Sequence, residues 1–101
     1  MPRNPSQPII HDPSRTPVVV AARRTPVGNF RGSLSQLKAH ELGACVIKQL
    51  ISDTKIDPNQ IDEVIVGQVL TALCGMNPAR QAAMHGGVPE RVPSYNVNKV
   101  C

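Results

Sequence analysis

The chain has 101 residues, a net charge of +4 and 41% hydrophobic residues, with one Phe, one Tyr and no Trp, so it forms at most one small domain with an aliphatic core. Three cysteines without a Cys-x-x-Cys pair argue against a disulfide framework and favour a reducing compartment. With no secretory apolar segment and no run near the roughly 20 residues of a membrane span, we predict a cytoplasmic protein without a membrane partner; the arginine-rich opening leaves a mitochondrial location as the alternative.

The first 15 residues are polar and rich in proline, and we predict that they form a flexible extension to a domain over residues 16–101. The positive charge lies near this end, because residues 1–31 contain five arginines and one acidic residue whereas the two signs balance in residues 32–101. The arginines are not interleaved with aromatic residues and form no known binding motif, so we predict no nucleic-acid partner.

The first ordered element is predicted at residues 17–22, where a continuous apolar run is typical of a strand buried on both faces. Residues 23–32 read as a loop with solvated arginines. Ser33 and Gln36 resemble a capping box, which predicts a helix from there to about Asp53. At helical spacing its apolar face comprises Ala39, Leu42, Gly43, Val46, Ile47, Leu50 and Ile51.

A second strand is predicted within residues 61–70, where Gly67 indicates a bulge or a close backbone approach. Asn77, followed by proline, predicts the start of a second helix, and the glycine pair after residue 85 predicts its end. Arg80 and Gln81 lie in this helix, and both are candidates for bracing neighbouring loops.

A third strand is predicted at residues 94–100, which alternate between apolar and polar side chains and lead into Cys101. The order strand, helix, strand, helix, strand has crossovers long enough for right-handed βαβ units. The sequence therefore predicts an α/β fold with a largely parallel sheet covered by helices, and sites in such sheets lie outside the carboxyl ends of the strands.

Cys101 is the candidate catalytic residue, because a thiolate is a strong nucleophile and this cysteine follows a predicted strand. Position alone supports equally well a nucleophilic cysteine and a cysteine without a chemical role. The histidines His11, His40 and His85 lie far apart in the sequence without metal-ligand spacing, so we predict no metal site.

Several short motifs combine into a more specific signal than any of them gives alone. From Val18 onward they resemble, in order and spacing, the N-terminal portion of a thiolase, most closely that of the acetyl-CoA acetyltransferases (acetoacetyl-CoA thiolases). One departure is Met76, where the family usually has Gln before Asn-Pro. The matching motifs occupy residues 24–30, 41–44, 66–70, 77–83, 87–89 and 97–101.

The resemblance implies that residues 16–101 are an incomplete N-terminal thiolase domain, a βαβαβ portion of the first of two similar halves, truncated at the nucleophile. It implies that Cys101 attacks acetyl-CoA to form an acetyl-enzyme, which a second, deprotonated acetyl-CoA converts to acetoacetyl-CoA; the reverse reaction is thiolysis. Coenzyme A thioesters are then the substrates and no cofactor is needed. The full-length family forms dimers or tetramers.

The family's histidine, second cysteine, asparagine and coenzyme A loop lie beyond the matched motifs, so we assign no coenzyme A contact here and expect the 101-residue chain alone to be inactive. Two alternatives stay open: a degradative 3-ketoacyl-CoA thiolase, and a non-catalytic truncated product that binds a partner through an exposed sheet edge.

Overall fold

The computed structural model describes residues 12–101, so most of the predicted extension lies outside the described residues. In the described part of that extension, Pro13–Arg15 form one turn of 3-10 helix. The turn forms because the Asp12 carboxylate accepts a hydrogen bond from the Ser14 amide at 3.0 Å, and because proline suits the first helical position.

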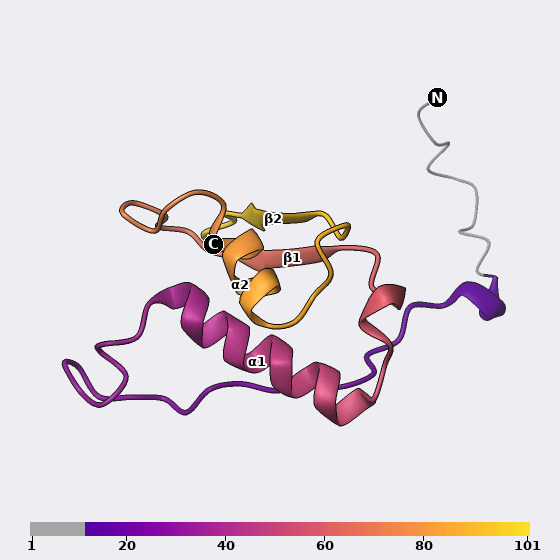
Figure 1. The fold of residues 1–101 in the computed structure, drawn as a ribbon, viewed down its shortest axis with the longest axis horizontal. Helices are drawn as coiled ribbons and strands as arrows, with labels where there is room; N and C mark the ends of the chain where they lie inside the picture. Colours follow the sequence, from indigo (N-terminus) through magenta and orange to yellow (C-terminus); the bar gives the residue numbers. More distant parts are fainter. Residues whose placement is uncertain (1–11) are drawn as a thin grey trace.

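Residues 12–101 contain two α-helices and two β-strands (Figure 1). In chain order they are α1 (Ala39–Thr54), β1 (Val64–Gly67), α2 (Pro78–His85) and β2 (Ser94–Val97), with a 3-10 turn at Pro58–Gln60 before β1. The strands are parallel, with Val64 opposite Ser94 and Gly67 opposite Val97. The predicted α/β class with parallel strands and helical cover is thus confirmed. Neither helix within residues 12–101 combines the length and apolar character of a membrane span.

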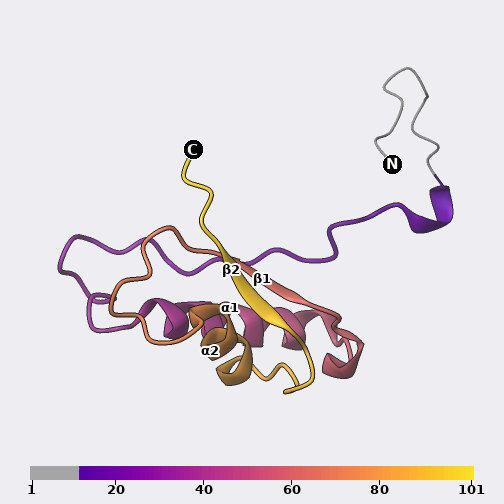
Figure 2. The same cartoon turned by 90° about the horizontal axis from the view of Figure 1, so that it is seen from above.

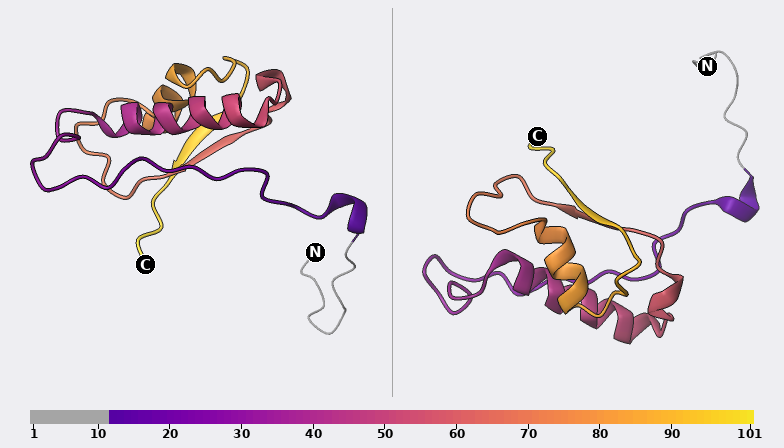
Figure 3. Two further views of the ribbon diagram at one scale, coloured as in Figure 1. Left: turned by 90° about the horizontal axis from the view of Figure 1, so that it is seen from below. Right: turned by 45° about the horizontal axis from the view of Figure 1, so that its top comes forward.

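The short helix α2 lies between α1 and the strand pair and contacts both (Figure 3). Its inward face consists of small residues, with Ala79, Ala82 and Ala83 almost fully buried. The core continues past the helix end through Val88 and Val92, and side chains from α1 and β1 pack against it. The protein therefore has a small aliphatic core centred on α2, as the composition predicts.

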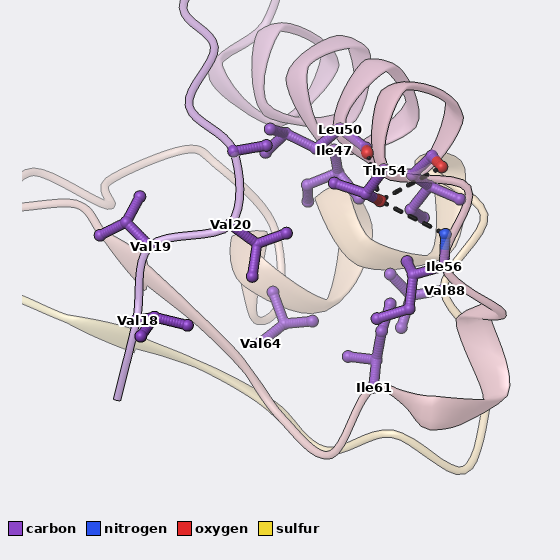
Figure 4. A pocket seen from close by; sticks show the side chains of 12 residues that line it. Val18, Val19, Val20, Ile47, Leu50, Thr54, Ile56, Ile61, Val64 and Val88 are labelled. Atoms are coloured by element: carbon purple, nitrogen blue, oxygen red, sulfur yellow. Dashed lines mark hydrogen bonds between the residues drawn. The ribbon is translucent and has the colours of Figure 1, made fainter. Parts of the chain in front are cut away.

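The first predicted strand is wrong. Residues 17–22 are extended but do not pair with any strand in the described chain, and Val18, Val19 and Val20 are 76%, 87% and 78% exposed. With side chains of α1 and Val64 of β1 they line an apolar groove of about 650 Å³. Val20 points towards Val64 in this groove (Figure 4). The apolar pattern gives the tendency to extend, but a strand also needs backbone partners, which the segment does not meet.

Helix α1 starts later than predicted. The Ser35 hydroxyl donates to the Gly32 carbonyl at 2.7 Å, which holds residues 30–37 in turns and takes the predicted capping residues out of the helix. Instead, the Lys38 amide donates to the Glu41 carboxylate at 2.6 Å and the helix begins at Ala39. The predicted end near Asp53 is confirmed, and so is the apolar face except at Ala39, which is exposed. Ala44, which the predicted face did not include, is buried.

The other boundaries follow the predicted signals more closely. The second predicted strand is confirmed over a shorter range, Val64–Gly67, and Gly67 shows neither a bulge nor a close neighbour, since nothing in the described chain lies within 4 Å of a Cβ built there. Asn77 caps α2 by accepting from the Arg80 amide at 3.1 Å, and Gly86 ends the helix. Both boundaries of α2 are therefore as predicted.

Glycine permits the close crossing of the two helices. A Cβ built on Gly43 would lie 3.2 Å from the Cβ of Ala82. A Cβ built on Gly86 would lie 2.7 and 2.8 Å from two side-chain carbons of Ile47, although the backbone φ of Gly86 is −81° and suits any residue. The requirement for glycine at position 86 is thus steric.

We predict that Gly86→Ala lowers the free energy of unfolding by about 1–3 kcal/mol, because the added methyl forces α1 and α2 apart. Gly67→Ala is the matched control, since a methyl there meets open space, and its unfolding should be nearly unchanged. Urea denaturation of the 101-residue chain measures both. Equal stability of the two variants would contradict the close helix crossing.

An ion pair fixes the segment that leads into α1. Arg23 donates to the carboxylate of Asp53, and Gln49 donates to the same carboxylate at 2.8 Å. The hydrogen bond from Arg23 and, second, that from Gln49 lower the pKa of Asp53 from its usual value. The prediction that Arg23 is simply solvated is therefore wrong. Its side chain is nevertheless 55% exposed, so the pair adds little stability.

Replacing Arg23 tests this assignment. We predict that Arg23→Gln raises the pKa of Asp53 towards its usual value and that Gln49→Ala raises it less, as measured by NMR titration of the carboxyl carbon. A lowered pKa stabilises the fold above the carboxyl pKa of the unfolded chain, and this contribution is lost as the pH falls through the folded-state pKa. Arg23→Gln should therefore weaken the acid dependence of unfolding. An unchanged Asp53 titration would contradict the pairing.

Candidate active site

The carboxyl ends of the two strands meet at one edge of the sheet. The Gln68 amide donates to the Val97 carbonyl at 2.9 Å, which extends the pairing of β1 and β2 by one step. Two segments leave this edge: the loop of residues 68–77, which leads to α2, and residues 98–101, which lead away from the body of the protein (Figure 2). Cys101, four residues beyond the end of β2, is exposed with a free thiol.

Two glutamines hold the loop of residues 68–77. The Gln81 amide group on α2 donates to the carbonyls of Cys74 and Met76 at 3.0 and 2.8 Å. The side-chain amide nitrogen of Gln68 donates to the Leu70 carbonyl at 3.2 Å and lies 3.4 Å from the Cys74 sulfur. These contacts confirm Gln81 as a loop brace. The Met76 side chain is 90% exposed, so among the described residues the departure from the family pattern changes no packing.

Arg80 braces the segment on the other side of α2. Its guanidinium donates to the carbonyls of Val92 and Glu90, both at 2.7 Å. Val92 is fully buried, so its carbonyl needs a partner from within the protein. This confirms the predicted bracing role of Arg80, which fixes the turn that feeds β2.

Two asparagines join the start of α2 to β2. The Asn77 side chain accepts from the Arg80 amide and donates to the Ser94 carbonyl at 2.9 Å. In the opposite sense, the Asn96 side-chain oxygen accepts from the Ala79 amide at 3.1 Å. Asn96 did not stand out in the sequence; its only signal is a polar residue at an inward position of an alternating strand.

Among the described residues, the histidines and the other two cysteines form no second centre. His40 and His85 contact each other, with ring centroids 5.6 Å apart, where α1 meets α2. Cys45 is exposed on α1, and His11 lies outside the described residues. A cleft of about 420 Å³ lies beside Lys38, His40 and Cys74. Over residues 12–101, no three His, Cys, Asp or Glu side chains are grouped as metal ligands.

A parallel strand pair with helical cover, and a free cysteine beyond its carboxyl edge, define an α/β protein with a candidate thiol site. The chain belongs to the thiolase family: residues 17–101 match the family model described as "Thiolase, N-terminal domain".

Relatives support the same family. The chain is 58% identical over 84 residues to an "Acetyl-CoA acetyltransferase" of Pseudomonas aeruginosa and, over the same length, to a "Probable acetyl-CoA acyltransferase" of Staphylococcus epidermidis. It is 54% identical over 84 residues to a "Probable acetyl-CoA acyltransferase" of Staphylococcus aureus. Each match covers 83% of this chain and 21% of the relative, so the chain spans about a fifth of the length of these proteins.

The Arg80 brace can be tested by removing its hydrogen-bond donors. We predict that Arg80→Met lowers the free energy of unfolding by roughly 2–4 kcal/mol, because two charge-assisted hydrogen bonds are lost and a buried carbonyl is left without a partner. Arg91→Met, an exposed change in the same segment, is the control and should cost less than about 0.5 kcal/mol. Urea unfolding of the 101-residue chain measures both, and equal losses would contradict the brace.

Proposed function

We propose that this chain supplies the nucleophilic cysteine of a thiolase active site, and that Cys101 carries the acyl group. The observation that supports this most directly is the position of Cys101, free and exposed just beyond the carboxyl edge of a parallel strand pair. The family match, which runs to residue 101, supports the same function.

In the proposed reaction the Cys101 thiolate attacks the carbonyl carbon of acetyl-CoA, the bond from that carbon to the coenzyme A sulfur breaks, and coenzyme A leaves as a thiolate. A base outside residues 17–101, for which the family resemblance implies the second cysteine, takes a proton from the α-carbon of a second acetyl-CoA. The resulting carbanion attacks the carbonyl carbon of the acetyl-enzyme, the bond from that carbon to the Cys101 sulfur breaks, and acetoacetyl-CoA leaves as the Cys101 thiolate is regenerated. A thiolate suits both steps, because it is a good nucleophile and a good leaving group. The Cys101 amide is suited to donate to the oxyanion that forms at each attack.

The proposed substrates are coenzyme A thioesters, without a further cofactor, and the proposed setting is a cytoplasmic homodimer or homotetramer of the full-length enzyme. The names of the relatives support acyl transfer, and the word "acyltransferase" in two of them leaves a degradative 3-ketoacyl-CoA thiolase as the alternative substrate class.

A non-catalytic binding role is the second candidate, and the uncovered face of the strand pair favours it. Ile65, Tyr95 and Val97 point away from α2 and are 53%, 42% and 42% exposed. Partial burial and, second, the Glu63 carboxylate raise the pKa of the Tyr95 phenol, which favours its neutral form further. Such a face is suited to contact another protein layer.

A chimera separates the two candidates. In it, residues 17–101 replace the matching segment of the Pseudomonas aeruginosa acetyl-CoA acetyltransferase. We predict that the chimera takes up a radiolabelled acetyl group from acetyl-CoA and that Cys101→Ala lowers this labelling by at least about 10³-fold, because the nucleophile is lost. Quenched, denatured protein is assayed for the label.

Cys45→Ala is the matched control, since this exposed thiol on α1 has no part in the proposed reaction. Its labelling should equal that of the parent chimera. The 101-residue chain alone should make no acetoacetyl-CoA. Undiminished labelling of the Cys101→Ala chimera would contradict the catalytic assignment and favour the binding role.

A further inference from the structure

Asn96 occupies an unusual place for a polar residue. Side chains along β2 alternate between the two faces of the sheet, so Asn96 points inward whereas Tyr95 and Val97 point outward. Its side-chain oxygen accepts a hydrogen bond from the Ala79 amide, and Ala79 has no exposed surface. The first amides of a helix have no partner within the helix, and one left unpaired in the interior is costly. Asn96 thus satisfies a donor that water does not reach.

The start of α2 is satisfied entirely by asparagines and proline. Pro78 has no amide hydrogen, the Ala79 amide pairs with Asn96, and the Arg80 amide pairs with Asn77. Asn77 also donates to the Ser94 carbonyl on β2. Two polar contacts therefore cross from α2 to β2, one in each direction, and they fix both the height and the rotation of the helix against the strand.

Asn96 uses only part of its hydrogen-bonding capacity. Its side-chain nitrogen is buried and has no hydrogen-bond acceptor among the described residues. The Ser94 hydroxyl on the same face is also buried, and it has no hydrogen-bond partner among them either. The oxygen is therefore the atom that holds the helix, because only an acceptor can face an amide hydrogen.

We propose that Asn96 is a positioning residue for Cys101; this inference rests on the proposed function. Asn96 is the last inward-facing residue of β2, because Val97 points outward and the strand ends there. Its contact with α2 sets the depth and direction at which the chain leaves the sheet towards Cys101. Displacement of a reacting atom by about 1 Å can cost about 100-fold in rate, so the contact acts on catalysis through the placement of the thiol.

Three substitutions at position 96 of the chimera separate the acceptor from side-chain bulk. Asn96→Leu keeps the shape and removes the acceptor, Asn96→Ala removes the acceptor without adding apolar bulk, and Asn96→Asp keeps an acceptor oxygen in the same place. A carboxylate is tolerated at the start of a helix, where the helix dipole favours negative charge. Ser94→Ala is the matched control, because it removes a hydroxyl without a partner from the same face of β2.

We expect Asn96→Leu and Asn96→Ala to lower the single-turnover rate of Cys101 acetylation by about tenfold or more, with little change in KM for acetyl-CoA, because placement of the thiol and not substrate binding is affected. Asn96→Asp and Ser94→Ala should stay within about threefold of the parent. Parental rates in Asn96→Leu and Asn96→Ala, equal losses in Asn96→Asp and Asn96→Leu, or a loss confined to KM would each overturn the proposal.

The 101-residue chain provides a readout that does not depend on activity. The Ala79 amide should exchange with solvent faster in Asn96→Leu than in Asn96→Asp, as measured by NMR, and equal exchange rates would overturn the contact itself. The Cys101→Ala chimera keeps the two proposals apart. If the Cys101→Ala chimera is still labelled in full, the proposed function is overturned. If that chimera loses its label but Asn96→Leu and Asn96→Ala react at the parental rate, only the role of Asn96 is overturned.

Discussion

The close crossing of α1 and α2 is the constraint on which the rest of this structure depends. Gly43 and Ala82 meet at the crossing, and Gly86 lies against Ile47 where no side chain fits. Because the helices approach so closely, α2 needs only small residues to fill the space between α1 and the strands, and eight residues suffice for it. A larger side chain at the crossing would move α2 and, with it, the strand that leads to the thiol.

Hydrogen bonds then orient what the apolar contacts bring together. A helix whose inward face is alanine makes few directional contacts, since methyl groups slide over one another at little cost. Arg80, Gln81, Asn77 and Asn96 supply the direction: they fix the turn before β2, the loop after β1 and the start of α2. The architecture of the candidate site is thus built from side-chain contacts to the backbone.

The same structure exposes apolar surface on two sides. One is the groove between residues 18–21 and the inner faces of α1 and β1 (Figure 4), and the other is the outer face of the strand pair. The relatives are about five times as long as the matched segment, and surfaces of this kind are suited to packing against further layers of a larger protein. Residues 98–101 carry Cys101 away from the body of the protein, and β2 joins them to its outer apolar face, so in the proposed enzyme β2 links the chemistry to the assembly.

The sequence by itself determined the features that depend on local chemistry. Asn77 and Pro78 start α2 and Gly86 ends it because capping and backbone sterics act within a few residues. Alternation and crossover length were enough for the two parallel strands, but the strand predicted over residues 94–100 is too long, because β2 ends at Val97 and Cys101 lies four residues beyond it. Tertiary structure decided what depends on distant partners: residues 17–22 meet no partner strand within residues 12–101, and Arg23 pairs with Asp53. Asn96 belongs with these, because only the fold brings its oxygen to the buried amide of Ala79.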